Sequence, residues 1–399
     1  MSDVWPVARL SHLVEFLPGI DHSKVEDPDG CFPVFGSGGE FARSSVALRH
    51  GEGVLFGRKG TVDRPTYVSG KFWHVDTAYF ARPRDRRLHP KYLAYWSQTI
   101  PFGLLSTNTA LPSVTSADLG ELTIPVPPHS TQTGIADYLD HETAEIDEFV
   151  KDLKTLQTLT VERRWAALNE QLSDLSLAST LTPLKVHAVI QAGLTLGTNY
   201  ANKDLSDYPY LRVANVQDGS LDLDEIKTVA VPANVAQAVT LREGDVLVTE
   251  GGDRDKLGRG AIWPGHIAPM LHQNHVFAVR CKETLEPEYL TYVLEGQRAR
   301  VYFDQTARQS TNLASTNVTL LRSFRFPVPS VEQQREFIKR QKTTDRICAA
   351  ELEDITRAIT LAKERRAALI TAAVTGQIDV TKKNRPAVEQ LQDDIEEQK

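Results

Sequence analysis

The sequence has little cysteine and no long apolar run. Its three cysteines, Cys31, Cys281 and Cys348, lie far apart and show no Cys-x-x-Cys spacing, so neither a disulfide framework nor a zinc site is indicated. No apolar run approaches the roughly 18 residues of a membrane-spanning helix. Residues 1–18 also lack the basic and then apolar order of an export signal. We therefore expect a cytoplasmic protein.

The motifs of several enzyme classes are missing as well. An adenine methyltransferase needs an Asn/Asp-Pro-Pro-Tyr/Phe loop, and the sequence has none. Residues 36–39 (Gly-Ser-Gly-Gly) follow a Phe-Pro turn and do not open a helix, which argues against a cofactor loop. Residues 51–61 contain glycines and a lysine but not Gly-x-x-x-x-Gly-Lys-Ser/Thr, so no nucleotide phosphate loop is indicated.

Scattered carboxylates and histidines do not form a recognisable site either. Asp245, Glu250 and Lys256 are in the wrong order for a nuclease, and we interpret them as ordinary turn residues. His272 and His275 have a spacing that metal ligands use, but only one cysteine lies near as a third ligand, so core or surface histidines are the better interpretation. We predict no catalytic residue, no cofactor-binding residue and no metal ligand in this chain.

Positive charge is not in excess. The chain has 45 Lys and Arg against 52 Asp and Glu, a net charge of −7, which taken alone argues against a nucleic-acid-binding protein. The total is a sum over the whole chain, however, and the four acidic residues within 393–397 (Asp-Asp-Ile-Glu-Glu) contribute to it. A DNA phosphate responds to local charge, so basic loops on an acidic chain remain compatible with DNA binding.

What the sequence does contain is an internal duplication. Each copy begins with a proline-rich junction, continues to a glutamine and later carries Glu-Arg-Arg. The offset between the copies is 202 residues at every landmark. The landmarks are Pro125, Gln132 and Glu162 in the first copy and Pro327, Gln334 and Glu364 in the second. The sequence is therefore two half-chains of the same plan.

Each copy predicts one long helix. Prolines suit a helix entry, and a long proline-free run follows near Ser130 and near Val331. Apolar residues then recur at steps of four and three, the spacing of a seam that faces a partner helix. A helix of roughly 40 residues is about 60 Å long and needs a partner for its apolar stripe. We predict that the two helices pair, antiparallel, as a spacer. The pairing candidates are Ile146, Val150, Leu153, Leu352, Ile355 and Ile359.

The duplication also predicts the domain organisation. The fold class is α+β, with two globular domains related by the duplication and separated by two long helices that form an antiparallel coiled coil. The predicted segments are residues 1–128 (domain 1), 129–178 (helix 1), 179–330 (domain 2), 331–380 (helix 2) and 381–399 (an acidic tail expected to be disordered). Matching strand-like runs, such as residues 75–80 and 273–278, support the repeat of the domains.

The two domains differ in their polar loops. Equivalent strands are followed by residues 57–61 in domain 1 and 249–260 in domain 2, and a second polar stretch precedes each proline-rich junction. Arg, Asn and Gln can bind base edges bidentately, whereas Ser and Thr can hold phosphates. We predict DNA-binding residues on these loops. They are Arg58, Lys59 and Asn108 in domain 1 and Arg254, Lys256, Arg259, Arg308 and Gln309 in domain 2.

The order of domain, junction and helix, twice over, resembles the specificity subunit of type I restriction-modification enzymes. The motifs that carry the resemblance are residues 326–334 (Phe-Pro-Val-Pro to Glu-Gln-Gln), 364–376 (Glu-Arg-Arg to Gly) and 210–219 (Tyr-Leu-Arg-Val-Ala-Asn-Val-Gln-Asp-Gly). Domain 1 lacks the full Tyr-Leu-Arg-Val-Ala-Asn run, which fits recognition domains with different targets.

The resemblance implies a function and a set of partners. In that family each domain is a target recognition domain for one half of a bipartite, asymmetric site in double-stranded DNA, and the helices dock methyltransferase subunits. S-adenosylmethionine, ATP and Mg are then expected on the methyltransferase and restriction/translocase subunits, with no cofactor in this chain. Two alternatives remain: a coiled-coil scaffold that binds proteins and has no salt-dependent DNA affinity, or a specificity subunit of a methylation-only or type II system.

Overall fold

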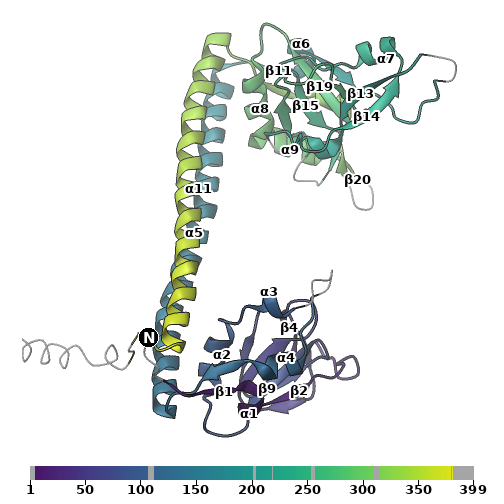
Figure 1. The fold of residues 1–399 in the computed structure, drawn as a ribbon. Helices are drawn as coiled ribbons and strands as arrows, with labels where there is room; N and C mark the ends of the chain where they lie inside the picture. Colours follow the sequence, from purple (N-terminus) through teal and green to yellow (C-terminus); the bar gives the residue numbers. More distant parts are fainter. Residues whose placement is uncertain are drawn as a thin grey trace, which may run out of the picture. The chain divides into compact units, whose positions relative to one another are not determined.

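The structure is a computed structural model that describes residues 5–106, 112–200, 204–217, 219–252, 257–309, 314–378 and 380. The acidic tail, residues 381–399, lies outside this described part. The chain divides into two compact units, which are described separately below. Unit 1 consists of Met1–Thr155 and Ile355–Lys399, and unit 2 is Leu156–Asp354. Both long helices contribute residues to both units (Figure 1).

The described residues of unit 1 form two four-stranded sheets. The first has the order β2 (Val14–Pro18), β9 (Ala78–Pro83), β6 (Gly53–Gly57), β7 (Thr66–Val68), with all neighbours antiparallel. The second has the order β4 (Gly39–Ser44), β3 (Phe32–Gly36), β8 (Lys71–His74), β5 (Arg49–His50). A further pair joins β1 (Val7–Arg9) to β10 (Thr123–Pro125). The short helices are α1 (Leu10–Leu13), α2 (Pro90–Ser97), α3 (Phe102–Leu105) and α4 (Ser116–Glu121).

Unit 2 repeats this plan. Its four-stranded sheet has the order β12 (Ala188–Ala192), β19 (Val276–Cys281), β15 (Val246–Thr249), β17 (Gly260–Ile262). A three-stranded sheet has the order β14 (Lys227–Val231), β13 (Ser206–Leu211), β18 (Leu271–His272). Strand β11 (Leu181–Pro183) pairs with β22 (Arg325–Pro327), as β1 pairs with β10. The helices are α6 (Leu184–His187), η1 (Val213–Asn215), α7 (Ala233–Ala238), α8 (Pro287–Glu295), α9 (Gln297–Thr306) and α10 (Val318–Ser323).

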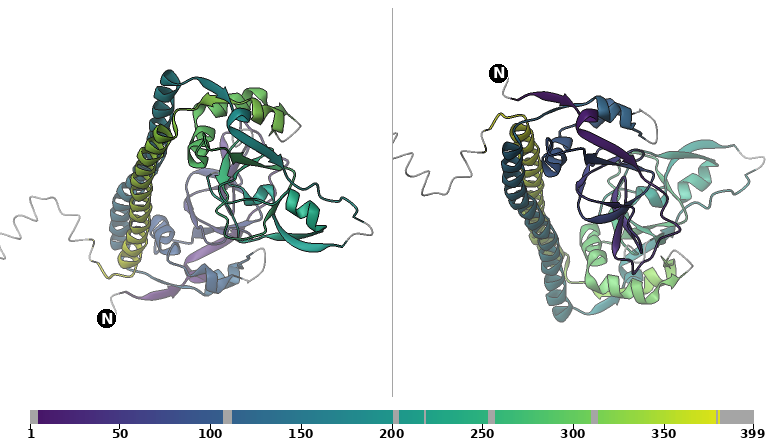
Figure 2. Two further views of the ribbon diagram at one scale, coloured as in Figure 1. Left: turned by 90° about the horizontal axis from the view of Figure 1, so that it is seen from above. Right: turned by 90° about the horizontal axis from the view of Figure 1, so that it is seen from below.

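The long helices are α5 (His129–Ala178, 50 residues) and α11 (Val331–Val374, 44 residues). They begin where the prolines predict, and both are longer than the predicted 40 residues. Figures 1 and 2 show them side by side. In unit 1, Ile146 and Val150 of α5 share a buried cluster with Ile355 and Ile359 of α11, and Leu153 packs against its edge.

The pairing continues in unit 2 with polar contacts. The Cys348 thiol donates to the Thr160 carbonyl over 3.8 Å, and Gln171 Nε2 donates to Gln341 Oε1 over 3.1 Å. Residue numbers rise along α5 while those of the partner residues fall along α11, so the pair is antiparallel. Leu352, the remaining pairing candidate, is a half-buried residue of α11. The predicted α+β class with two domains and a coiled coil is confirmed.

Gln132 ties the first turn of α5 to domain 1. Its side chain is fully buried. Nε2 donates to the carbonyls of Arg87 and Pro127, both at 2.8 Å, and Oε1 accepts from the His89 N–H at 2.8 Å. The single amide therefore satisfies three backbone groups that lie where helix, proline junction and the entry of α2 meet.

Gln334 makes the same three bonds in unit 2. Its buried amide donates to the carbonyls of Thr284 (3.0 Å) and Pro329 (2.9 Å) and accepts from the Glu286 N–H (2.9 Å). These bonds explain why glutamine stands at both positions of the duplicated sequence. A side chain with both a donor and an acceptor end is required there, and burial makes each unmade bond costly.

Two buried tyrosines lock the proline junctions in the same way. The hydroxyl of Tyr92 donates to the Pro125 carbonyl, and that of Tyr289 donates to the Pro327 carbonyl, both over 2.9 Å. Burial raises the pKa of both phenols because it disfavours the charged form. These tyrosines therefore act as neutral hydrogen-bond donors of the scaffold.

An ion pair also recurs, with its charges exchanged. Lys91 on α2 pairs with Asp140 on α5. At the corresponding places in unit 2, Glu288 on α8 lies 2.6 Å from Lys342 on α11. The two halves thus keep an ion pair between a globular domain and the start of its long helix, although the residue types at both positions differ.

The second arginine of each Glu-Arg-Arg motif connects its long helix to residues that belong to the other copy of the duplication. On α5, Arg164 Nε lies 2.7 Å from an oxygen of Asp345, and the guanidinium also pairs with Glu295 at the end of α8. On α11, Arg366 Nε lies 3.0 Å from Asp147 of α5, and its Nη1 donates to the Gln98 side chain. Each globular domain is therefore held by residues of both helices.

Candidate nucleic-acid interface

In domain 1 the polar loop after β6 lies next to residues 112–114, which precede α4. The segment after β6 runs beside the segment before α4, where Gly60 N–H donates to the Pro112 carbonyl (2.9 Å) and Val114 N–H donates to the Arg58 carbonyl (3.0 Å). Lys59 is exposed and forms an isolated β-bridge with Ser113. Loops that are about 50 residues apart in sequence thus form one surface. The predicted contact Asn108 lies outside the described residues.

Arg58 is held in place on this surface. Its backbone N–H donates to the Thr77 carbonyl over 2.8 Å. Its guanidinium carbon lies 5.8 Å from the centroid of the Tyr79 ring, and Nη1 donates to the Asp76 carbonyl over 3.4 Å. A cation over an aromatic face is attracted by the ring quadrupole, so this guanidinium is partly pre-oriented while its remaining donors stay available.

The corresponding loops of domain 2 form a small sheet. Strands β16 (Gly251–Gly252), β21 (Ala314–Ser315) and β20 (Arg308–Gln309) pair antiparallel in that order. The Thr316 N–H also donates to the Glu250 carbonyl over 2.8 Å. The backbones of the predicted residues Arg308 and Gln309 therefore lie next to the loop that follows β15.

The remaining predicted contacts of domain 2 belong to that same loop. Arg259 is half-buried just before β17. Arg254 and Lys256 lie outside the described residues. In both domains the loop after the equivalent strand (β6 or β15) therefore lies next to a described segment that precedes α4 or α10, although these segments share no sequence pattern.

Each of these edges has a third segment that the sequence analysis did not select. It is the turn before β9, with Asp76 and Thr77, and the turn before β19, with Asn274 and His275. The alignment of residues 75–80 with 273–278 already placed these turns at equivalent positions. The signal that could have identified them is the difference in polar residues at these two positions, between two strand-like segments that otherwise match.

Histidines of the described residues serve packing in several places. His74 and His272 are fully buried at equivalent positions in β8 and β18. Burial lowers the pKa of His74 to about 4 and also lowers that of His272. The His272 ring bonds the Val276 carbonyl at 2.6 Å. Within the described part of the chain, no group of three or more His, Cys, Asp or Glu is placed to hold a metal ion.

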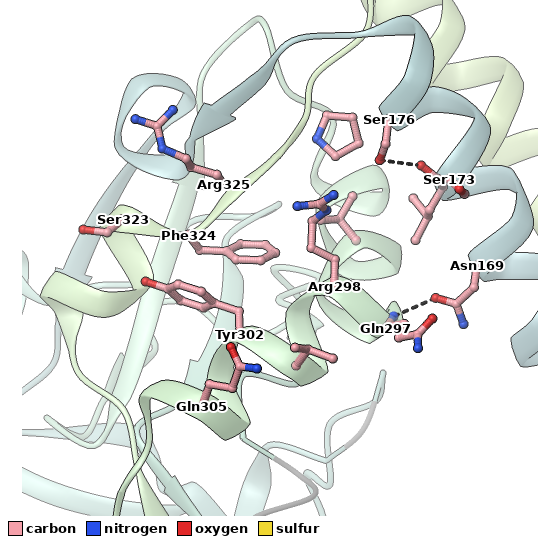
Figure 3. A pocket seen from close by; sticks show the side chains of 14 residues that line it. Asn169, Ser173, Ser176, Gln297, Arg298, Tyr302, Gln305, Ser323, Phe324 and Arg325 are labelled. Atoms are coloured by element: carbon pink, nitrogen blue, oxygen red, sulfur yellow. Dashed lines mark hydrogen bonds between the residues drawn. The ribbon is translucent and has the colours of Figure 1, made fainter.

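A pocket of about 580 Å³ lies in unit 2 where α9 and β22 face the end of α5 (Figure 3). One hydrogen bond connects α9 to α5 at the wall of this pocket. The Gln297 N–H donates to Asn169 Oδ1 over 2.6 Å. Arg298, Tyr302 and Phe324 line it, and it contains no paired carboxylates or nucleophile with a base. The arrangement of these residues is that of a domain packed against a helix.

Among the helices that the structure describes, none combines the length and the apolar composition that a membrane-spanning segment needs.

Comparisons with known proteins agree with this architecture. Residues 5–156 match the family described as the type I restriction modification DNA specificity domain. The chain is 29% identical over 153 residues to a putative type I restriction enzyme MjaX specificity subunit of Methanocaldococcus jannaschii. That match covers 38% of this chain and 35% of the relative, so the chain spans about a third of the length of this relative.

Solved structures match over nearly the whole chain. One comes from a study of complex assembly and conformational transition of the type I R-M system, with a TM-score of 0.64, 16% identity, and coverage of 94% of this chain and 98% of that one. Another is the HsdS subunit from Thermoanaerobacter tengcongensis, with a TM-score of 0.51, 18% identity, and coverage of 95% and 98%. At these identities the likeness establishes the fold. The resemblance predicted from the sequence is confirmed.

Proposed function

We propose that this chain, which carries the type I restriction modification DNA specificity domain at residues 5–156 and has the fold of a type I specificity subunit, recognises a bipartite, asymmetric DNA site. The observation that supports the proposal most strongly is the pair of loop surfaces. Within each domain, the loop after the equivalent strand lies next to the segment before α4 or α10, and these segments differ in sequence between the domains. Equivalent positions with different side chains are what two half-sites of different sequence require.

The loop residues divide into two roles. Exposed cations such as Lys59 neutralise phosphates and seat each domain on the duplex. Residues with planar, bidentate groups then enter the major groove, where each good pair contributes about 1 to 3 kcal/mol of discrimination. We assign the second role to Arg58 and Asn108 in domain 1 and to Arg308 and Gln309 in domain 2. We assign the first role in domain 2 to Arg254, Lys256 and Arg259.

The chain acts by position and leaves the chemistry to partner subunits. The helix pair α5 and α11 serves as the spacer that fixes the gap between half-sites and as the docking surface for methyltransferase subunits. S-adenosylmethionine for methyl transfer, and ATP and Mg for a restriction/translocase subunit, belong to those partners. The chain itself is non-catalytic, and the complex works in the cytoplasm.

The salt dependence of DNA binding tests this proposal. For the full-length chain and a pool of random-sequence duplexes, log affinity is expected to fall linearly with log salt concentration. In the double variant Arg58→Ala/Lys59→Ala the slope should become shallower by about 0.9 for each phosphate that the variant no longer neutralises. Titrations by fluorescence anisotropy at several salt concentrations provide the measurement.

A matched variant removes two lysines from the helices of the same unit, Lys151→Ala/Lys363→Ala. Both lysines are exposed on α5 and α11. Because this variant also removes two positive charges, its change in net charge equals that of the loop variant. Its slope should stay at the wild-type value. An equal reduction of the slope in both variants, or a wild-type chain with no salt-dependent affinity, contradicts the proposal, and the second result favours a protein-binding scaffold.

A further inference from the structure

Three segments of domain 2 meet at Glu250, the residue that follows β15. Its N–H donates to the His275 carbonyl over 2.9 Å, and its carbonyl accepts from the Thr316 N–H over 2.8 Å. Glu250 therefore connects the turn before β19 to the loop that carries β20 and β21. Any side chain at this position lies at the centre of the proposed DNA surface.

Domain 1 has the same junction with different side chains. The Arg58 N–H donates to the Thr77 carbonyl over 2.8 Å, and the Arg58 carbonyl accepts from the Val114 N–H over 3.0 Å. The backbone arrangement is equivalent, yet an arginine stands where domain 2 has a glutamate. The neighbouring turn carries Asp76 and Thr77 where domain 2 has Asn274 and His275. A shared backbone with exchanged polar groups indicates positions that set specificity.

The glutamate and the histidine form a defined pair. Glu250 Oε2 lies 2.5 Å from His275 Nδ1, and the side chains are 30% and 52% exposed. An ionised carboxylate can only accept, so the proton of this bond lies on Nδ1. The other ring nitrogen, Nε2, lies 3.5 Å from Asn274 Nδ2. The carboxylate thus fixes the ring, and the ring and the amide lie next to each other at an exposed turn.

Glu250 and Asn274 line a hollow, and the His275 side chain beside them is exposed. A hollow of about 660 Å³ is lined by Glu250 and Asn274 together with Asn317 and Thr319 at the start of α10. A lone carboxylate beside DNA phosphates is unfavourable by charge, so Glu250 is not placed to seat the backbone. The bond from His275 to Glu250 indicates a different role for the glutamate. It holds the imidazole ring of His275 in one orientation, as residues that support a binding site do.

We propose that Asn274 and His275 are base-contacting residues of domain 2, and that Glu250 is the positioning residue that orients His275. This inference rests on the proposed function and deepens it, since it names a third specificity element beside the two loops. Asparagine can bind adenine bidentately through N6 and N7. The ring of His275 contributes one further polar contact at the adjoining base pair.

Selection from a library of random-sequence duplexes by the full-length chain tests the inference. In Asn274→Ala, discrimination is expected to fall by about 5- to 150-fold at one position of one half-site, which is the range that one bidentate pair to a base supplies. In His275→Ala, which removes one polar contact, it should fall by a smaller factor at the adjoining position. The other half-site should be enriched unchanged. Both changes leave the backbone bonds of the turn intact, so the folded fraction should match that of the wild type.

The variant Glu250→Gln tests whether Glu250 orients the His275 ring, because it changes the carboxylate and keeps the backbone bonds of residue 250. It should relax the same positions as His275→Ala, and the double variant Glu250→Gln/His275→Ala should discriminate no less than His275→Ala alone, because the glutamate acts through the ring. The matched control is Glu286→Gln, which changes a carboxylate of the same domain that accepts from Arg335 over 2.7 Å. This control should leave the enriched sequence unchanged.

The outcomes separate the inference from the proposed function. If the wild type enriches a sequence and the Asn274, His275 and Glu250 variants enrich the same one, the third specificity element is overturned while DNA recognition stands. If the wild type enriches no sequence, both are overturned. Additive effects in the double variant would remove the positioning role of Glu250.

Discussion

Replacing Gln334 with leucine is expected to destabilise unit 2 by about 4 kcal/mol. The substitution keeps the volume of the side chain but removes three hydrogen bonds, to the carbonyls of Thr284 and Pro329 and from the N–H of Glu286. A buried polar group left without a partner costs about 1 to 3 kcal/mol. The leucine also provides no substitute donor or acceptor for the junction.

The neighbouring residue supplies the control. Gln333 is exposed and its Oε1 accepts from the Ser330 N–H over 3.0 Å, so Gln333→Leu should cost at most about 1 kcal/mol. Urea unfolding combined with hydrogen exchange of unit 2 gives both values. Equal destabilisation by the two variants would show that the buried amide does not anchor the helix. The equivalent change Gln132→Leu should have its effect on unit 1.

An aspartate at position 355 is expected to separate the helices within unit 1. Ile355 is 7% exposed and packs in one cluster with Ile146, Val150 and Ile359. Placing a carboxylate there removes the burial of an isoleucine and leaves a charge without a partner, at a cost of about 4 kcal/mol or more. Residues 129–155 and 355–374 should then lose protection from hydrogen exchange.

Leu361→Asp provides the matched comparison, because Leu361 is on the same helix but is 58% exposed. Surface substitutions of this kind change stability by about 0.5 kcal/mol or less. Exchange rates of α5 and α11 in unit 1 should therefore stay at the wild-type value. Helices that stay protected from hydrogen exchange in Ile355→Asp, or that lose this protection in Leu361→Asp, would contradict the helix pairing through Ile355.

The long helices and their pairing could be predicted from the sequence because they depend on local and periodic signals. Prolines mark the entries, and apolar residues such as Ile146 and Ile355 recur at helical spacing. The polar continuation of the seam was harder to predict, since Gln171 finds its partner Gln341 only once the antiparallel register is known. The same holds for Arg164, whose partners Glu295 and Asp345 come from two distant segments.

The proposed DNA surface could be predicted from the sequence only in part. Polar loops after equivalent strands could be found from the sequence, but the two-residue strands β16, β20 and β21 depend on pairing between loops far apart in sequence. Glu250 and His275 were each weighed alone, as a nuclease carboxylate and as a metal ligand. Their pairing across 25 positions becomes visible only in the fold.

The exchanged ion pair shows a further limit of sequence comparison. Lys91 and Glu288 differ in charge, and so do Asp140 and Lys342, so each position looks unrelated between the two halves. The structure places them as two pairs of opposite polarity at equivalent contacts. Complementarity between a domain and its helix, and not the residue type, is the property that the duplication has kept.

The most direct test of the central claim, that one duplicated scaffold carries two different DNA-recognising surfaces, is a genome-wide map of modified adenines in cells with and without this chain. We expect modified sites that depend on the chain to share two half-sites of different sequence at a fixed separation, and Arg58→Ala to alter the preference at one half-site only. A single uninterrupted or symmetric site, or a map that does not change when the chain is removed, would contradict it.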